Sequence, residues 1–209
     1  MIEFKALSAL LSYPSEQLRQ ALPEIAEVIR GSRLLAERER AALLTLTEEL
    51  AIGDLLDAEE RYVALFDRTR AASLHLFEHL YGDSRDRGDA MVELKRVYER
   101  AGFQLSTIEL PDYLPVLLEY LSCRDLAEAR DLLSDCAHIL KKVAETLIGN
   151  GSAYAAVLQA LIVIAGDQPV EARAAPKAPL QRENVDRDWF EEPAFAGVPL
   201  TAFRADEKS

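Results

Sequence analysis

The segment from Glu109 to Ser122 reads ELPDYLPVLLEYLS, and its spacing indicates the fold class. Leu114, Leu117, Leu118 and Leu121 recur every three or four residues, which places them on one face of a helix. Pro111 fits the first turn of that helix, where a missing N–H is tolerated. The same spacing extends in both directions, almost everywhere before Gly166, and strict alternation persists nowhere. The sequence therefore predicts an all-α fold.

Capping and breaking residues divide this pattern into successive helices. Ser15 is expected to cap a helix that runs to about Arg30, with Pro23 predicting a kink or a break inside it. Asp54 opens a later helix, and Asp125 is expected to cap one long helix that reaches Leu147. The remaining apolar stripes are Leu7–Leu11, Leu43–Leu50, Thr69–Tyr81, Met91–Tyr98 and Tyr154–Ile164.

The composition changes after Gly166, which suggests one folded domain and a tail. The chain has 209 residues, 49% of them hydrophobic, which suffices for one well-packed domain. Residues 1–165 are therefore predicted to form a single-domain helical bundle. Residues 166–209 hold five of the nine prolines and are expected to form an acidic, extended and partly disordered tail. Trp189 is either a docking point of this tail on the bundle or a local contact.

Charge and cysteine content exclude several classes of protein. The formal net charge is −12, so nucleic acid is not an expected partner. The start of the chain lacks the pattern of a signal peptide, and no apolar run is long enough to span a membrane. Cys123 and Cys136 form neither a disulfide framework nor a zinc knuckle and are expected to be buried, inert thiols. We expect a soluble, cytoplasmic protein without membrane insertion.

One short pattern suggests catalysis. His75-Leu76-Phe77-Glu78-His79 matches H-x-x-E-H, in which two histidines bind zinc and the glutamate acts as general base of a metallopeptidase. Five-residue matches of this kind arise by chance, and no third ligand follows downstream. The alternative is two histidines on the polar flank of an amphipathic helix. The chain has neither a glycine-rich phosphate loop nor a G-x-S-x-G motif.

Tyrosine and arginine are concentrated next to acidic residues in the middle of the chain, which is the composition of a binding face. The clustered residues are Tyr62, Phe66, Arg68, Arg70, Arg85, Arg87, Asp112, Tyr113, Glu119 and Tyr120. The alternative is structural, because tyrosine can complete a core with its hydroxyl in water and Asp112 can favour a helix N-terminus.

Two blocks of this region carry a family resemblance. YVALFDRTRAASLHLFEHLYGDSRDRG, from Tyr62 to Gly88, and ELPDYLPVLLEYLS resemble the signature blocks of the nitrate reductase molybdenum cofactor assembly chaperones, the delta subunits. LSALLSYP, from Leu7 to Pro14, fits the same family, which belongs to the TorD-like redox-enzyme chaperones. The similarity covers residues 1–165 and does not extend into the tail.

The resemblance implies a TorD-like helical bundle with no catalysis, no cofactor and no bound metal. It implies a chaperone, monomeric or homodimeric, that binds the N-terminal segment of the apo catalytic (alpha) subunit of respiratory nitrate reductase. Such a chaperone assists molybdenum cofactor insertion before the enzyme docks on its membrane anchor. A chaperone of another molybdoenzyme is the near alternative.

The resemblance also directs the site prediction. The client segment is expected to be a basic amphipathic helix held in a groove and steered by the acidic body. The predicted client-binding residues are Tyr62, Phe66, Asp112, Tyr113, Leu117, Glu119 and Tyr120. A second contact, or a structural cluster, is expected at Arg68, Arg70, His75, His79, Arg85 and Arg87.

Overall fold

The structure is a computed structural model that describes residues 1–82, 84–105 and 109–171, and these ranges are helical. Within them the backbone forms one isolated β-bridge and no strand, so the all-α prediction is confirmed. The helices are α1 (Ile2–Leu11), α2 (Glu16–Gly31), α3 (Glu37–Ile52), α4 (Leu55–Tyr62), α5 (Leu76–Tyr81), α6 (Asp86–Arg100), α7 (Leu114–Ser122), α8 (Leu126–Asp135), α9 (Ala137–Gly149) and α10 (Ala155–Ile164). A π-helical segment, Val63–Asp67, continues α4, and a 3-10 turn, Arg70–Ala72, precedes α5.

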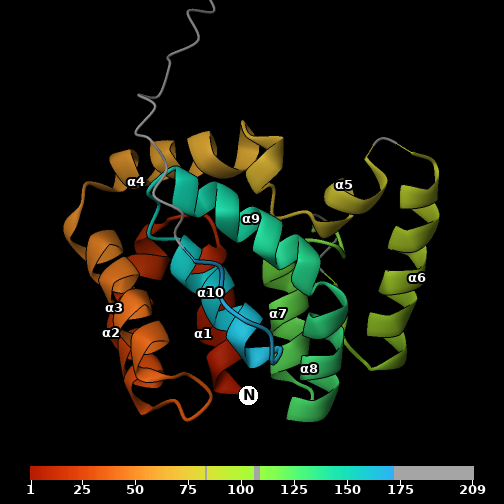
Figure 1. Cartoon of the computed structure of the whole chain (residues 1–209), viewed down its shortest axis with the longest axis horizontal. Coiled ribbons are helices and arrows are strands. Elements are labelled where there is room, and N and C mark those ends of the chain that lie inside the picture. The colour runs from red at the N-terminus through yellow and green to blue at the C-terminus, as the bar shows by residue number, and fades with distance from the viewer. Residues whose placement is uncertain (83, 106–108, 172–209) are drawn as a thin grey trace, which may run out of the picture. The chain divides into compact units, whose positions relative to one another are not determined.

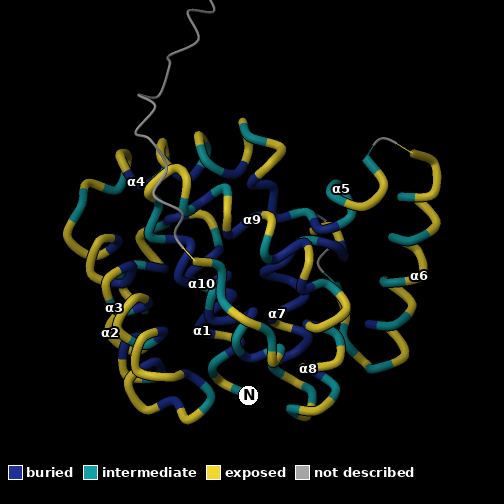
Figure 2. The backbone as a smooth tube through the Cα atoms, in the orientation of Figure 1, coloured by how far each residue is buried: buried dark blue, intermediate teal, exposed yellow. Residues whose placement is uncertain are grey.

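The helix α10 lies at the centre of the helical unit. Eight of its ten residues are buried, and a helix that is apolar on all sides must be enclosed by other helices. Its neighbours are α9, α3, α8 and α1, while α1 also packs along α7 and α2 along α3 (Figure 1). Figure 2 shows the buried backbone gathered around α10, α1 and α7 and the exposed backbone on the outer helices.

Side-chain caps start three of the helices where the sequence predicts. The Ser15 hydroxyl accepts a hydrogen bond from the Leu18 N–H at 3.1 Å. The Asp54 carboxylate accepts one from Leu56 at 2.8 Å, and the Asp125 carboxylate accepts one from Glu128 at 2.9 Å. Each cap contributes about 1 kcal/mol to stability, so these residues fix where the helices begin.

Two prolines can be compared with their predictions, which were a kink or a break at Pro23 and a first-turn position for Pro111. The helix α2 continues through Pro23, so the predicted break does not occur. Burial of Leu22, Ile25 and Ile29 on one face outweighs the local cost of the proline, which is roughly 3 kcal/mol. Pro111 lies in the turn before α7, and Pro115 instead occupies the first turn of that helix.

Two predicted helices are interrupted. The segment from Asp125 to Leu147 forms α8 and α9, because Cys136 leaves the helical region with φ −99° and ψ 5°. The stripe Thr69–Tyr81 becomes regular helix only at Leu76, after the 3-10 turn and the β-bridge between His75 and Tyr113. In both cases the apolar spacing continues across a change of chain direction.

The helices α5 and α6 form an arm that packs mainly on itself. Tyr98 is the one residue of α6 that is buried in the structure as described. Its hydroxyl donates to the Pro111 carbonyl at 2.9 Å, and its ring centroid lies 4.7 Å from that of Tyr120. Gly82, with φ 57°, makes the turn at the end of α5, in a conformation that glycine adopts at low cost.

The first residues of the predicted tail are held against the helical unit. Lys141 Nζ lies 2.7 Å from a carboxylate oxygen of Asp167, and this hydrogen bond lowers the pKa of Asp167. The Gln159 side-chain amide donates to the Val170 carbonyl at 2.6 Å and accepts from its N–H at 2.9 Å. Part of the segment predicted to be tail therefore contacts the helical unit. Residues 172–209, including Trp189, lie outside the described residues.

No helix in the described part of the chain combines the length and the apolar character that crossing a membrane requires.

Candidate functional site

The two sequence blocks that resemble the chaperone family meet in space. His75 and Tyr113 form the isolated antiparallel bridge. The Leu76 N–H donates to the Asp112 carbonyl at 3.0 Å, and the Leu114 N–H donates to the Leu74 carbonyl at 2.9 Å. This short pairing fixes the start of α5 against the start of α7.

Asp112 joins the blocks through its side chain. It is fully buried, and one carboxylate oxygen lies 3.2 Å from His75 Nδ1. The other oxygen accepts from the Phe77 N–H at 3.2 Å and lies 3.7 Å from an Arg87 guanidinium nitrogen. A buried carboxylate is tolerated when hydrogen bonds and an opposite charge compensate its lost hydration. Asp112 therefore pins the α5–α6 arm to α7.

Aromatic side chains pack beside this junction. The Tyr62 hydroxyl donates to the Leu11 carbonyl at 2.7 Å and lies 2.9 Å from the Tyr113 hydroxyl. The Tyr62 ring centroid lies 4.7 Å from that of Phe66, which lies 5.2 Å from that of Tyr154. Burial raises the pKa of Tyr62, Tyr113 and Tyr154 above that of free tyrosine, so these phenols stay protonated. The hydroxyls of Tyr62 and Tyr113 serve as hydrogen-bonding groups.

A polar cleft of about 440 Å³ opens next to the junction, and we call it the arginine cleft. Its lining residues are Phe66, Asp67, Arg68, Arg70, Ser73, His75 and Glu78. Two guanidinium groups face two carboxylates in this set, and Glu78 also lies 3.3 Å from Arg87. The charges of the arginine cleft are therefore largely balanced within the protein.

In the fold, the two histidines and the glutamate of the H-x-x-E-H pattern each bond a different protein group. His75 precedes α5 as its N-cap and bonds Asp112, whereas His79 lies within the helix and its Nε2 contacts the Ser73 carbonyl at 2.9 Å. Glu78, the supposed general base, pairs with Arg87. Among the described residues, no group of three or more histidine, cysteine or acidic side chains could hold a metal ion.

The residues predicted to bind a client differ in their access to solvent. Tyr113 is half-buried and Glu119 is exposed. The other five predicted residues are buried: Tyr62, Phe66, Asp112, Leu117 and Tyr120. Their proposed role as apolar anchors or charge partners stays a prediction, and in this conformation their side chains serve the core.

Tyr120 and Tyr62 belong to different aromatic clusters. Tyr120 packs with Tyr98 and Phe103, its hydroxyl donates to Glu128 at 3.2 Å, and the Arg124 guanidinium lies 5.1 Å above its ring. The structure therefore does not gather all the predicted tyrosines into one face.

The predicted arginines and cysteines also differ in their access to solvent. Arg68, Arg70 and Arg85 are exposed, while Arg87 is half-buried and holds Glu78 and Asp112. Cys123 is exposed, which corrects the expectation of a buried thiol, because it follows the last turn of α7. Cys136 is half-buried, and burial raises the pKa of its thiol to about 12.

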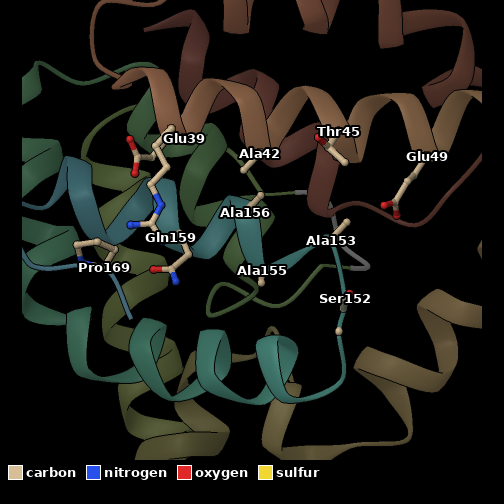
Figure 3. Close-up of a pocket in the computed structure, with 12 residues that line it drawn as sticks. Glu39, Ala42, Thr45, Glu49, Ser152, Ala153, Ala155, Ala156, Gln159 and Pro169 are labelled. Carbon is tan, nitrogen blue, oxygen red and sulfur yellow. The ribbon is translucent and has the colours of Figure 1, made fainter. Parts of the chain in front are cut away.

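The sequence did not predict a second concave surface, which lies between α3 and α10 and which we call the α3–α10 groove. It has a volume of about 440 Å³ and includes alanines from both walls, Ala42 from α3 and Ala155 and Ala156 from α10 (Figure 3). Glu39 and Glu49 of α3 also line it. The one feature of the sequence that points to this groove is Glu39, an acidic residue at a position on the buried face of α3.

Known proteins resemble this chain over most of its length. A family model described as nitrate reductase delta subunit matches residues 14–158. The chain is 44% identical over 165 residues to the Escherichia coli (strain K12) nitrate reductase molybdenum cofactor assembly chaperone NarJ, covering 79% of this chain and 70% of that protein. It is 34% identical over 163 residues to a Bacillus subtilis (strain 168) protein named "probable nitrate reductase molybdenum cofactor assembly chaperone NarJ", covering 77% and 86%.

The fold also has a solved counterpart. A redox enzyme maturation protein from Archaeoglobus fulgidus matches with a TM-score of 0.57 at 22% identity, covering 80% of this chain and 94% of that one. At this identity the match shows a shared fold.

Proposed function

This chain belongs to the nitrate reductase delta-subunit family, and from that premise we propose that it is an assembly chaperone of respiratory nitrate reductase. In this role it binds the N-terminal segment of the apo catalytic subunit in the cytoplasm. It keeps that subunit competent for molybdenum cofactor insertion until the enzyme docks on its membrane anchor. The protein itself performs no catalysis, as befits a family of assembly chaperones.

One observation carries the proposal. The family match runs from residue 14 to residue 158, and both sequence blocks lie within it. Relatives similar over 165 and 163 residues are named for molybdenum cofactor assembly in nitrate reductase. The resemblance inferred from the two blocks is thereby confirmed at the level of the family.

The geometry of the blocks supports a binding protein. Side chains at this junction that could move a proton are already bonded to other protein groups, namely His75, Glu78, His79 and Asp112. A general base must reach the proton that it abstracts from a substrate. These groups hold the α5–α6 arm in place, which is a structural use of polar side chains.

The test is calorimetric titration of the full chain with a peptide of the catalytic subunit's N-terminus, at low and moderate salt. We expect saturable one-to-one binding that weakens as salt rises, because the chain carries a net charge of −12. A peptide of the same composition in scrambled order is the control and should bind more weakly. Absence of binding to the native-order peptide would overturn this client-recognition mode.

A second experiment identifies the client. The chain is used to capture apo catalytic subunits from strains that lack cofactor synthesis, with nitrate reductase and another molybdoenzyme expressed at equal levels. We expect retention of the nitrate reductase subunit. Preferential retention of the other subunit would assign the chain to a different molybdoenzyme.

A further inference from the structure

The α3–α10 groove differs from the arginine cleft in its walls. Its centre is formed by small side chains, with Ala42 on one helix facing Ala153 and Ala156 on the opposite side (Figure 3). Alanine side chains let two helix backbones approach closely, because the distance between packed helices is set by the side chains at the contact. The groove can therefore accept the apolar face of a short helix.

An unpaired carboxylate lies at one end of this groove. Glu39 is 6% exposed, and no hydrogen bond or ion pair to its carboxylate is found in the part of the chain that the structure describes. Its neighbour Arg40 instead bonds Glu37 and the carbonyls of Ser32 and Leu35. The Glu39 carboxylate oxygens keep access to solvent in the groove, where they can pair with a cation supplied from outside.

A second carboxylate lies at the other end. Glu49 lines the groove ten residues further along α3, which corresponds to about 15 Å at the rise of an α-helix. Among the described residues, Arg38 is the one cationic side chain that lines the groove, and it is exposed. The two carboxylates therefore give the groove an excess of negative charge, in contrast to the balanced arginine cleft.

We propose that the α3–α10 groove docks a short amphipathic helix with a basic residue toward each end, namely the client's N-terminal segment. This inference rests on the proposed function. The apolar face of the segment lies on the alanines, one cation pairs with Glu39 and another with Glu49. It relocates client recognition from the buried tyrosines to a groove that is lined partly by exposed residues of α3.

The first test changes charge. Glu49→Lys reverses the charge at one end of the groove, and its matched control is Glu48→Lys, an exposed neighbour on the same helix that does not line the groove. We expect the client peptide to bind Glu49→Lys at least ~10-fold more weakly than the unmodified chain. Glu48→Lys makes the same change in net charge and should weaken binding by less than ~2-fold.

The second test fills the groove. Ala42→Trp places a large side chain between the walls, and Ala41→Trp places the same side chain on an exposed position outside the groove. Only Ala42→Trp should abolish peptide binding. Both alanines are exposed, so circular dichroism and thermal melting should show that both variants fold.

The outcomes separate the two proposals. Loss of binding in Glu49→Lys and Ala42→Trp, with binding retained in both controls, supports docking in the groove. Equal peptide binding by all four variants would overturn docking in the α3–α10 groove and leave the proposed assembly role intact. Absence of binding by the unmodified chain overturns the groove as a docking site for this segment together with the proposed recognition of the client's N-terminus.

Discussion

The helical body (α1, α7, α9 and α10) and the α5–α6 arm are held by different forces. In the body, side chains such as Leu10, Leu118 and Leu158 are fully buried and pack against one another. In the arm, α5 buries Leu76 and α6 buries Tyr98, and polar attachment is added by the backbone bridge at His75 and by the Asp112 and Arg87 side chains. Apolar packing spreads stability over many contacts, whereas a polar junction concentrates it in a few groups whose geometry must be right.

The largest expected effect removes packing from the body. Leu118→Ala should lower the free energy of unfolding by about 3 kcal/mol, because the lost methyl groups leave a cavity in a close-packed core. Urea denaturation followed by circular dichroism measures the change. Leu80→Ala, at a position that is 48% exposed, is the control and should cost less than about 0.5 kcal/mol. A similar loss of stability in Leu118→Ala and Leu80→Ala would contradict the difference between the body and the arm.

The second effect breaks the polar junction. Asp112→Asn removes the charge that faces Arg87 and disturbs the contact with His75, which should cost about 2 kcal/mol. Hydrogen exchange should show faster exchange of the α5 and α6 amides, with α1 and α10 still protected. Asp131→Asn, an exposed substitution on α8, is the control. Uniformly faster exchange in all helices would show that arm and body unfold as one unit.

The third effect is smaller and concerns one hydroxyl. Tyr98→Phe keeps the ring against Tyr120 and leaves the Pro111 carbonyl without its donor, at a cost of about 1 kcal/mol. Denaturant titration measures the change in the free energy of unfolding. Tyr81→Phe is the control, because Tyr81 is an exposed residue of α5. A Tyr98→Phe protein as stable as the original would indicate that ring packing alone attaches α6.

The last effect is a pH dependence within the body, and it is absent at neutral pH. Burial raises the pKa of the Cys136 thiol to about 12, against roughly 8.5 for a free thiol. Between these values the unfolded state loses its proton first, so the contribution of Cys136 to stability is complete below pH 8.5 and declines as pH rises. The difference in urea midpoint between the unmodified chain and Cys136→Ala should change with pH only above that point.

Alkylation offers an independent check of the same contrast. Iodoacetamide at neutral pH should modify exposed Cys123 and spare Cys136. Equal labelling of both cysteines in the folded protein would contradict the raised pKa.

Periodicity predicted the helices well because each amphipathic face is recorded locally in the chain. Ser15 and Asp125 could be recognised as caps for the same reason, since their partners lie three residues away. The break at Cys136 was missed because the apolar spacing continues from α8 into α9.

The candidate site was harder to predict because the residues that contact one another there are distant in sequence. Asp112 was expected to meet a client and instead contacts His75, 37 residues away. The α3–α10 groove is lined by Ala42 and Ala156. No motif marks these alanines in the sequence, and they form a surface only when α3 and α10 pack together. Composition correctly indicated an acidic chain, but it could not indicate which carboxylates lack a partner.

The π-helical segment Val63–Asp67 has a consequence for the spacing of the family's first block. Its hydrogen bond from the Arg68 N–H to the Val63 carbonyl spans five residues, so the turn holds one residue more than an α-helix would. Deleting a single residue such as Ala64 would let the turn relax to α-helix while the residues on either side keep nearly the same orientation relative to one another. Arg68 would then keep its place in the wall of the arginine cleft, so this turn is where the block can lose one residue with least effect on the cleft.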